Sequence, residues 1–210
     1  MSGSERREAG GNADALREGL ARYFTPEELA RLRSARVGIA GAGGLGSNVA
    51  LMLARSGVED LLIIDHDVVD ASNLNRQQFW PRHVGRPKVE ALGELLRELN
   101  PHIRLELLAS RIDEATLPPL LPGCPVWVEA LDAPETKTLL VEQALLAGRR
   151  VASASGLAGM GGPLMRRRRL GNLVLVGDFE TDVAFAPPLA PRVTQAAALM
   201  ADAVLEFILA

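Results

Sequence analysis

The segment Gly41-Ala42-Gly43-Gly44-Leu45-Gly46 comes directly after the apolar run Val37-Gly38-Ile39-Ala40. A Gly-x-Gly-x-x-Gly pattern between a buried strand and a helix is typical of the turn that binds phosphate in a dinucleotide-binding βαβ unit. Glycines there permit a tight turn and a close approach of the backbone to phosphate at the N-terminus of the helix. Many enzymes share this turn, so by itself it leaves open a purely structural turn, a nicotinamide site and an ATP site.

Apolar runs and helical segments alternate along most of the chain. We expect strands at residues 37–40, 61–65, 104–108, 126–130 and 151–154. We expect helices at residues 14–24, 44–56, 87–99, 113–121, 134–147 and 192–209, and one more that starts at the capping box Thr25-Pro26-Glu27-Glu28. The alternation predicts an α/β fold with a doubly wound, Rossmann-like, mostly parallel sheet, whose ligands lie beyond the carboxyl ends of the strands.

The C-terminal part has a different pattern. The runs 165–170 and 173–176 flank Gly171-Asn172, which is a hairpin signal. We therefore expect an antiparallel C-terminal extension of the sheet, followed by a stiff linker at 187–191 and the closing helix. Residues 13–210 are expected to form a single domain after a disordered N-terminus at 1–12.

Two acidic residues follow expected strands. Asp65 ends the second strand at the spacing from the glycine turn that suits ribose recognition, and Asp132 comes just after the strand at 126–130. A carboxylate at a strand end is suited to a hydroxyl donor or to a hard cation. Both residues are therefore candidates for a ligand site at this edge of the sheet.

The connection from residue 66 to residue 86 carries a polar cluster. About twenty residues without an element of their own favour a functional loop, and this loop contains Asn73, Arg76 and Gln77, with Lys88 shortly after it. An Arg fork can take two phosphate oxygens at once and keeps its charge at any pH. The cluster suits a triphosphate, and an NAD enzyme has little need for it.

In this order, the glycine turn, Asp65-His66-Asp67, Ser72-Asn73-Leu74-Asn75-Arg76-Gln77 and Gly85-Arg86-Pro87-Lys88 closely resemble the ThiF/MoeB/HesA family. These enzymes adenylylate ubiquitin-like sulfur carriers and are related to the adenylation domains of ubiquitin-activating enzymes. The resemblance runs from about Tyr23 to Asp132 and, more loosely, from Ala190 to the C-terminus.

The resemblance implies an ATP-dependent adenylyltransferase that activates the C-terminal glycine carboxylate of a small ubiquitin-like sulfur carrier ending in Gly-Gly, giving carrier-AMP and pyrophosphate. It further implies Mg²⁺, a sulfur donor, a homodimer and a place in thiamine thiazole biosynthesis. By resemblance, Asp65 holds the ribose, Asp132 holds Mg²⁺, and Arg76, Lys88 and Asp132 are catalytic. The residues expected to bind ATP are Gly41, Gly43, Gly44, Gly46, Asp65, Asn73, Arg76, Gln77 and Lys88, with Gln77 the weaker candidate.

Other functions stay open at this point. A small NAD(P)-dependent oxidoreductase explains the glycine turn and Asp65, but it leaves Arg76, Lys88 and Asp132 without a role. A non-catalytic scaffold that binds the carrier keeps the fold but has no use for a full set of ATP contacts. Within the same superfamily, a carrier adenylyltransferase for molybdopterin synthase and a tRNA threonylcarbamoyladenosine dehydratase remain alternatives.

Composition and cysteine count restrict the class of protein further. The chain has 210 residues, a formal net charge of −3 and one cysteine, Cys124. The slightly acidic balance argues against general nucleic-acid binding, and the lack of a long apolar run predicts a cytoplasmic protein with no membrane contact. A single cysteine cannot build the Cys-based zinc site of many family members, so no zinc is expected. Cys124 precedes an apolar strand, where burial should raise the pKa of its thiol and suppress sulfur relay.

Several charged residues are ambiguous. Asp67 and Asp70 are expected to be turn residues rather than metal ligands. The run of arginines at 166–169 suits either a docking patch for an acidic carrier or a strand face in water. Relatives often place an N-terminal arginine in the neighbouring subunit's ATP site, and Arg17 and Arg22 are the candidates here. His66, His83 and His102 have no metal-ligand spacing.

Overall fold

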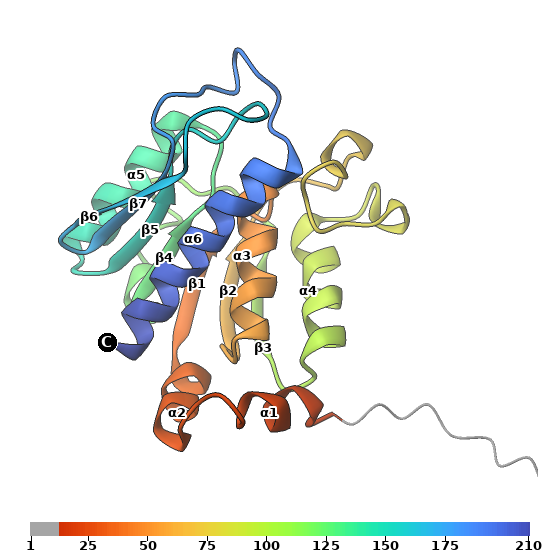
Figure 1. Ribbon diagram of the computed structural model, residues 1–210, viewed down its shortest axis with the longest axis vertical. Coiled ribbons are helices and arrows are strands. Elements are labelled where there is room, and N and C mark those ends of the chain that lie inside the picture. The colour runs from red at the N-terminus through yellow and green to blue at the C-terminus, as the bar shows by residue number, and fades with distance from the viewer. Residues whose placement is uncertain (1–12) are drawn as a thin grey trace, which may run out of the picture.

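The computed structural model describes residues 13–210, so the disorder expected at 1–12 lies outside the described residues. Its centre is a seven-stranded sheet with the order β3-β2-β1-β4-β5-β7-β6 (Figure 1). The strands are β1 (Arg36–Ala40), β2 (Asp60–Ile64), β3 (Arg104–Leu108), β4 (Val126–Glu129), β5 (Arg150–Ala154), β6 (Arg166–Leu170) and β7 (Leu173–Gly177). All neighbours are parallel except β6 and β7, which pair antiparallel. The expected Rossmann-like sheet and its antiparallel extension are confirmed.

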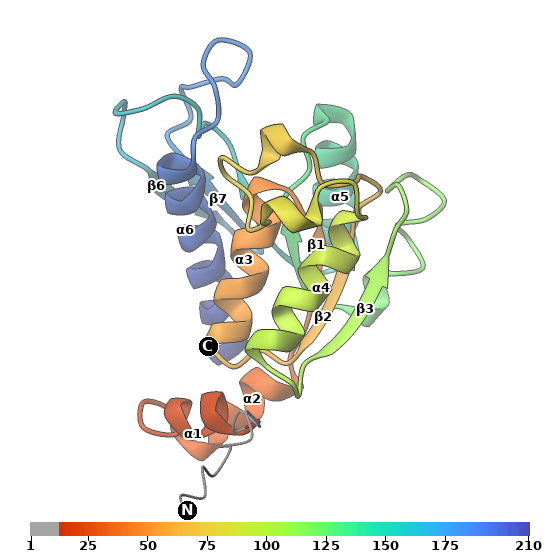
Figure 2. The same cartoon turned by 90° about the vertical axis from the view of Figure 1, so that its right-hand side faces the viewer.

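Helices cover both faces of the sheet. They are α1 (Ala15–Leu20), α2 (Pro26–Ser34), α3 (Gly44–Arg55), α4 (Lys88–Leu99), α5 (Pro134–Leu146) and α6 (Ala190–Leu209). Helices α3, α4 and α6 pack on one face and share one apolar core, whereas α5 packs on the other face around the buried Trp127 (Figure 2). Helices α1 and α2 lie at the amino ends of the strands, away from the glycine turn.

The junction of β1 and α3 explains its glycines. Gly41 has a φ of 95°, and a Cβ there would lie 2.4 Å from the carbonyl oxygen of Ala130 on the neighbouring β4 side. A Cβ on Gly46 would lie 1.8 Å from the carbonyl oxygen of Gly41. The turn therefore needs Gly41 for its conformation and Gly46 for the close packing of α3 against the turn.

Three expected boundaries are wrong. Residues 114–120 form turns and Leu121–Gly123 a short 3₁₀ helix, so the expected α-helix is absent there, because Pro118 and Pro119 disfavour helical backbone before them and supply no N–H. The helix expected at 14–24 stops at Leu20, since Thr25 must be extended to cap α2. Helix α6 starts at Ala190, inside the expected linker. Pro191 is tolerated in its first turn, because the N–H that proline lacks would have no hydrogen-bond partner within the helix at that position.

The loop between β2 and α4 is partly ordered by two short 3₁₀ helices, Ala71–Asn73 and Pro81–His83. Asp70 caps the first, because its carboxylate accepts from Ser72 N at 2.8 Å, and Asn73 Oδ1 in turn accepts from Asp70 N at 3.1 Å. Asp70 is thus the turn residue that was expected. In the part of the chain that the structure describes, no helix is long and apolar enough to cross a membrane.

Candidate functional site

A cavity of about 640 Å³ opens at the carboxyl ends of β1, β2, β4 and β5. Parallel strands place their carboxyl ends at one edge, so residues far apart in the sequence meet there. The cavity wall includes nearly all residues expected from the sequence, namely Gly41, Gly43, Gly44, Asp65, Asn73, Arg76, Gln77, Lys88 and Asp132. Gly46 is the exception, since it is buried behind the turn and supports it.

Asp65 connects the glycine turn to the end of β2. Its Oδ2 accepts a hydrogen bond from Ala42 N at 2.6 Å, and its Oδ1 accepts from Asp67 N at 2.8 Å. A carboxylate has about four acceptor positions, so Asp65, which lines the cavity, can accept further hydrogen bonds. Asp65 therefore fixes the turn and can still accept from ribose hydroxyls.

The loop after β2 brings a cation to the cavity. Arg76 is half-buried, and its Nη1 donates to Ser72 O at 3.2 Å and to Asn75 Oδ1 at 2.8 Å. No carboxylate pairs with Arg76 within residues 13–210, so its charge is held in place by neutral acceptors. A fixed guanidinium without an acidic partner suits a phosphate ligand.

Gln77 has a polar atom that lacks a partner. Its side chain is buried in the cavity wall, and its Oε1 makes no hydrogen bond within the described residues. Buried polar atoms are normally satisfied, so an orphan of this kind points to a bound group that would donate to it. The observation supports Gln77 as a ligand contact.

Lys88 forms an ion pair that the sequence did not indicate. Its buried Nζ donates to Asp67 Oδ2 at 2.7 Å, and this hydrogen bond holds the pKa of Asp67 below its usual range. Asp67 is therefore more than the turn residue expected above. Ligand atoms of Asp65, His66 and Asp67 also lie within 4.8 Å of one another, although no metal-ligand spacing was seen for His66.

Asp132 lies beyond the end of β4 with an exposed side chain. The turn before it is fixed by Glu129, which is fully buried and accepts from Leu131 N at 2.8 Å and from Ser153 Oγ at 2.6 Å. Lys137 on α5 donates from its Nζ to Glu129 Oε1 at 2.9 Å and to Leu131 O at 3.1 Å. This pair holds the segment that presents Asp132.

Sequence reasoning missed Glu129 and Lys137. A glutamate at the end of an otherwise apolar strand was the available signal, because a buried carboxylate must have a partner. Lys137 lines the cavity with 28% of its side chain exposed. Ser155, Gly156, Thr181 and other residues of the loops after β5 and β7 also line it and carried no sequence signal.

The N-terminal arginines lie far from the cavity of their own chain. Arg17 pairs with the buried Glu59 at the amino end of β2, with Nε 2.7 Å from Oε1. Cys124 is buried just before β4, at that same end of the sheet, and burial raises the pKa of its thiol as expected. Neither residue faces the cavity.

The arginines of β6 are mostly engaged within the chain. Arg166 pairs with Glu180 at 2.8 Å, Arg167 with Asp202 and Glu206, and Arg169 with Glu206 at 2.8 Å. The guanidinium of Arg168 lies 4.4 Å from the ring centre of Phe179. Arg167 and Arg169 therefore point to α6, whereas Arg166 and Arg168 contact the loop after β7. A docking role for these arginines stays untested.

One cavity thus brings together a glycine turn, an aspartate at a strand end and a loop that carries an arginine. Residues 17–209 match the model of the ThiF family. The chain belongs to the ThiF family. The resemblance drawn from the motifs is thereby confirmed.

Two curated relatives share part of their sequence with this ThiF-family chain. It is 43% identical over 128 residues to an "Adenylyltransferase and sulfurtransferase uba4" of Aspergillus terreus, a match that covers 60% of this chain and 26% of the relative. It is 40% identical over 116 residues to the "SAMP-activating enzyme E1" of Haloferax volcanii, covering 55% of this chain and 43% of the relative. The chain thus spans less than half the length of these curated relatives.

Solved structures share the fold. E. coli tRNA N6-threonylcarbamoyladenosine dehydratase in complex with AMP superposes with a TM-score of 0.81 over 91% of this chain and 93% of that chain, at 20% identity. E. coli MccB with ATP gives a TM-score of 0.69 at 27% identity, covering 86% of this chain and 57% of that chain. The likeness to the dehydratase concerns the fold.

Proposed function

We propose that this ThiF-family protein is an ATP-dependent adenylyltransferase that activates the C-terminal glycine carboxylate of a small ubiquitin-like sulfur carrier. The observation that carries the proposal is the single cavity, in which a phosphate-type glycine turn, Asp65, Arg76, Lys88 and Asp132 converge. The names of the uba4 and SAMP-activating relatives and the solved structure of MccB with ATP support it. Thiamine thiazole synthesis is the pathway we favour.

ATP fits the donors and acceptors of the cavity. The backbone of the glycine turn and the N-terminus of α3 favour phosphate, and Arg76 adds a charge that has no acidic partner among residues 13–210. Asp65 would accept from the ribose, and the orphaned Gln77 Oε1 would accept from a donor of the nucleotide. Asn73 and Lys88, which also line the cavity, would complete the phosphate contacts.

Asp132 fits Mg²⁺, because it presents an exposed carboxylate at a strand end and hard cations prefer oxygen ligands. A bound Mg²⁺ would neutralise charge on the phosphate oxygens. The pair of Glu129 and Lys137 keeps the segment of Asp132 in position. With one cysteine, the chain cannot supply a Cys-based zinc site by itself, so we propose that it works without zinc.

The reaction requires little covalent work from the protein. The carrier carboxylate oxygen attacks the α-phosphorus of ATP, a carboxylate–phosphate bond forms, the bond to the bridging oxygen breaks and pyrophosphate leaves with the electron pair. Rate comes from placing the nucleophile in line and from neutralising phosphate charge with Arg76 and Lys88. This suits a cavity without a nucleophilic cysteine, since Cys124 lies at the other end of the sheet.

An exchange assay tests the proposal. Purified protein, ATP, Mg²⁺, labelled pyrophosphate and candidate carriers ending in Gly-Gly should give carrier-dependent ATP–pyrophosphate exchange. Arg82→Ala is a matched control for Arg76→Ala, because both arginines belong to the same loop but only Arg76 lines the cavity. Exchange with only the carrier of molybdopterin synthase would assign the protein to molybdopterin synthesis instead of thiamine thiazole synthesis. Turnover of threonylcarbamoyladenosine tRNA without any carrier would favour the dehydratase, and an absence of exchange with every carrier would defeat the proposal.

A further inference from the structure

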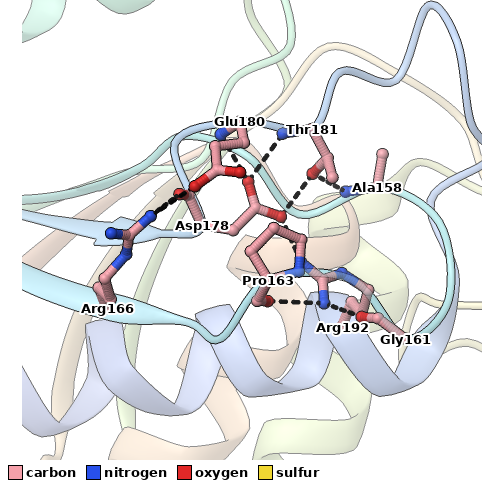
Figure 3. A network of polar contacts seen from close by, with 8 residues as sticks. All are labelled: Ala158, Gly161, Pro163, Arg166, Asp178, Glu180, Thr181 and Arg192. Carbon is pink, nitrogen blue, oxygen red and sulfur yellow. Dashed lines mark hydrogen bonds and ion pairs between the residues drawn. The ribbon is translucent and has the colours of Figure 1, made fainter.

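A buried ion pair ties the start of α6 to two loops at the cavity. The guanidinium of Arg192 contacts the carboxylate of Asp178 and the carbonyl oxygen of Gly161, and its Nη1 lies 3.2 Å from the carbonyl oxygen of Pro163 (Figure 3). The two charged side chains are 6% and 0% exposed. Replacing such a pair by apolar residues of similar size is often neutral or stabilising, so a gain in stability does not by itself account for the pair.

Asp178 orders both loops around its carboxylate. Its Oδ1 accepts from Glu180 N and Thr181 N at 2.8 Å each, and its Oδ2 accepts from Thr181 Oγ1 at 2.7 Å. Thr181 Oγ1 accepts in turn from Ala158 N at 3.1 Å. Gly156 has a φ of 78°, and a Cβ there would lie 2.1 Å from Asp178 Oδ1, so the carboxylate packs directly on the backbone of Gly156.

The same two loops form one wall of the cavity. Ser155, Gly156 and Leu157 follow β5, and Thr181, Asp182 and Val183 follow β7, and all six line the cavity. Figures 1 and 2 show these loops beyond the N-terminal end of α6, with the loop that carries Arg76 on the other side of α3. The ion pair of Arg192 and Asp178 therefore supports this wall from behind.

Charge distinguishes this wall from the rest of the cavity. The cavity-lining residues after β5 and β7 are uncharged except for Asp182, whereas the cationic residues of the cavity, Arg76, Lys88 and Lys137, come from other segments. Triphosphate requires the cationic part. A wall of mostly small and uncharged residues, which offers no cation to phosphate, suits the uncharged backbone of a peptide.

We propose that Arg192 and Asp178 are positioning residues that hold this wall for the peptide end of the second substrate, and that they contribute little to ATP binding. The identity of that substrate rests on the proposed function. The mechanical part, that the pair orders residues 155–163 and 178–183, is independent of any activity.

Hydrogen exchange with mass spectrometry tests the mechanical part without a carrier. Arg192→Met removes the donors and keeps the stem, and the double variant Arg192→Met with Asp178→Asn also removes the buried charge, so that the fold survives. Amides of 155–163 and 178–183 should exchange at least about tenfold faster in both variants. Arg167→Met is the control, since Arg167 forms ion pairs with α6 as well, but its partners Asp202 and Glu206 do not line the cavity.

Binding and kinetics test the positioning role. ATP affinity measured by calorimetry should stay within about twofold of wild type in the double variant, while KM for the carrier rises at least about tenfold and KM for ATP does not change. Three results would each overturn the inference. The wall amides could exchange as in wild type, the faster exchange could spread evenly over the β-sheet, or the affinity for ATP could fall as much as that for the carrier. If the wild type shows no carrier reaction, the proposed function fails, and hydrogen exchange and ATP affinity still decide whether the pair orders the wall.

Discussion

Replacing Lys137 by Met tests how the turn before Asp132 is held. The variant keeps the length of the side chain but leaves Glu129, which is fully buried, with only Ser153 Oγ and Leu131 N as donors. Removing one partner of a buried pair costs about 3–5 kcal/mol, because a buried charge loses its compensation. Lys137 is 28% exposed, and solvent screening reduces this figure, so we expect a loss of about 2–3 kcal/mol in the free energy of unfolding.

Urea unfolding followed by circular dichroism measures the loss. The matched control is the double variant Lys137→Met with Glu129→Gln, in which the buried charge is gone and the bond to Ser153 can remain. It should recover more than half of the lost stability, while carrier-dependent exchange stays low because Leu131 O has lost its donor. A loss below about 0.5 kcal/mol in the single variant, or no recovery in the double variant, would refute the reasoning.

Other predictions concern the cavity, the ion pair and the cysteine. Arg76→Ala should lower kcat/KM for exchange about 10²–10³-fold with little change in thermal stability. If it only lowered the melting temperature, Arg76 would be structural. Asp132→Ala should abolish exchange while the fold survives. Burial alone would raise the pKa of Asp178, but hydrogen bonds from Thr181, Glu180 and Arg192 outweigh it and lower the pKa to about 2. The stability from this group is present above about pH 4 and is lost as the pH falls through 2, so acid unfolding should remove about 2 kcal/mol more from wild type than from Asp178→Asn. Cys124→Ser should keep both adenylylation and thiocarboxylate formation when a sulfur donor is supplied, and a covalent carrier adduct at Cys124 would contradict this. Chelator-washed protein should contain no stoichiometric zinc by elemental analysis.

The sheet and most helices could be predicted from the sequence because local signals determine them. The run at 37–40 is apolar throughout, and the run at 126–130 is apolar except for Glu129, as buried parallel strands require. The capping box at Thr25 marks the start of α2. The failures came where tertiary structure or proline decides. Pro118 and Pro119 stopped the helix expected at 113–121, and Pro191 was assigned to a linker although it lies in the first turn of α6.

The candidate site could be located from the sequence because the carboxyl ends of parallel strands meet at one edge of the sheet. The glycine turn, Asp65 and Asp132 each follow such a strand end. Contacts between segments could not be read in the same way. Nothing in the sequence pairs Lys88 with Asp67 across 21 positions, or Arg192 with Asp178 across 14. Such pairs depend on how loops fold back over the sheet, which local patterns do not encode.

The most direct test of the central claim is detection of the adenylylated carrier itself. The protein is incubated with ATP, Mg²⁺ and a carrier ending in Gly-Gly, and intact-mass spectrometry follows the carrier, with a carrier lacking the last glycine as control. The account predicts that the carrier gains the mass of one AMP, that the truncated carrier does not, and that Arg76→Ala greatly lowers the yield while Arg82→Ala does not. ATP binding without an adenylate on any Gly-Gly carrier would contradict it.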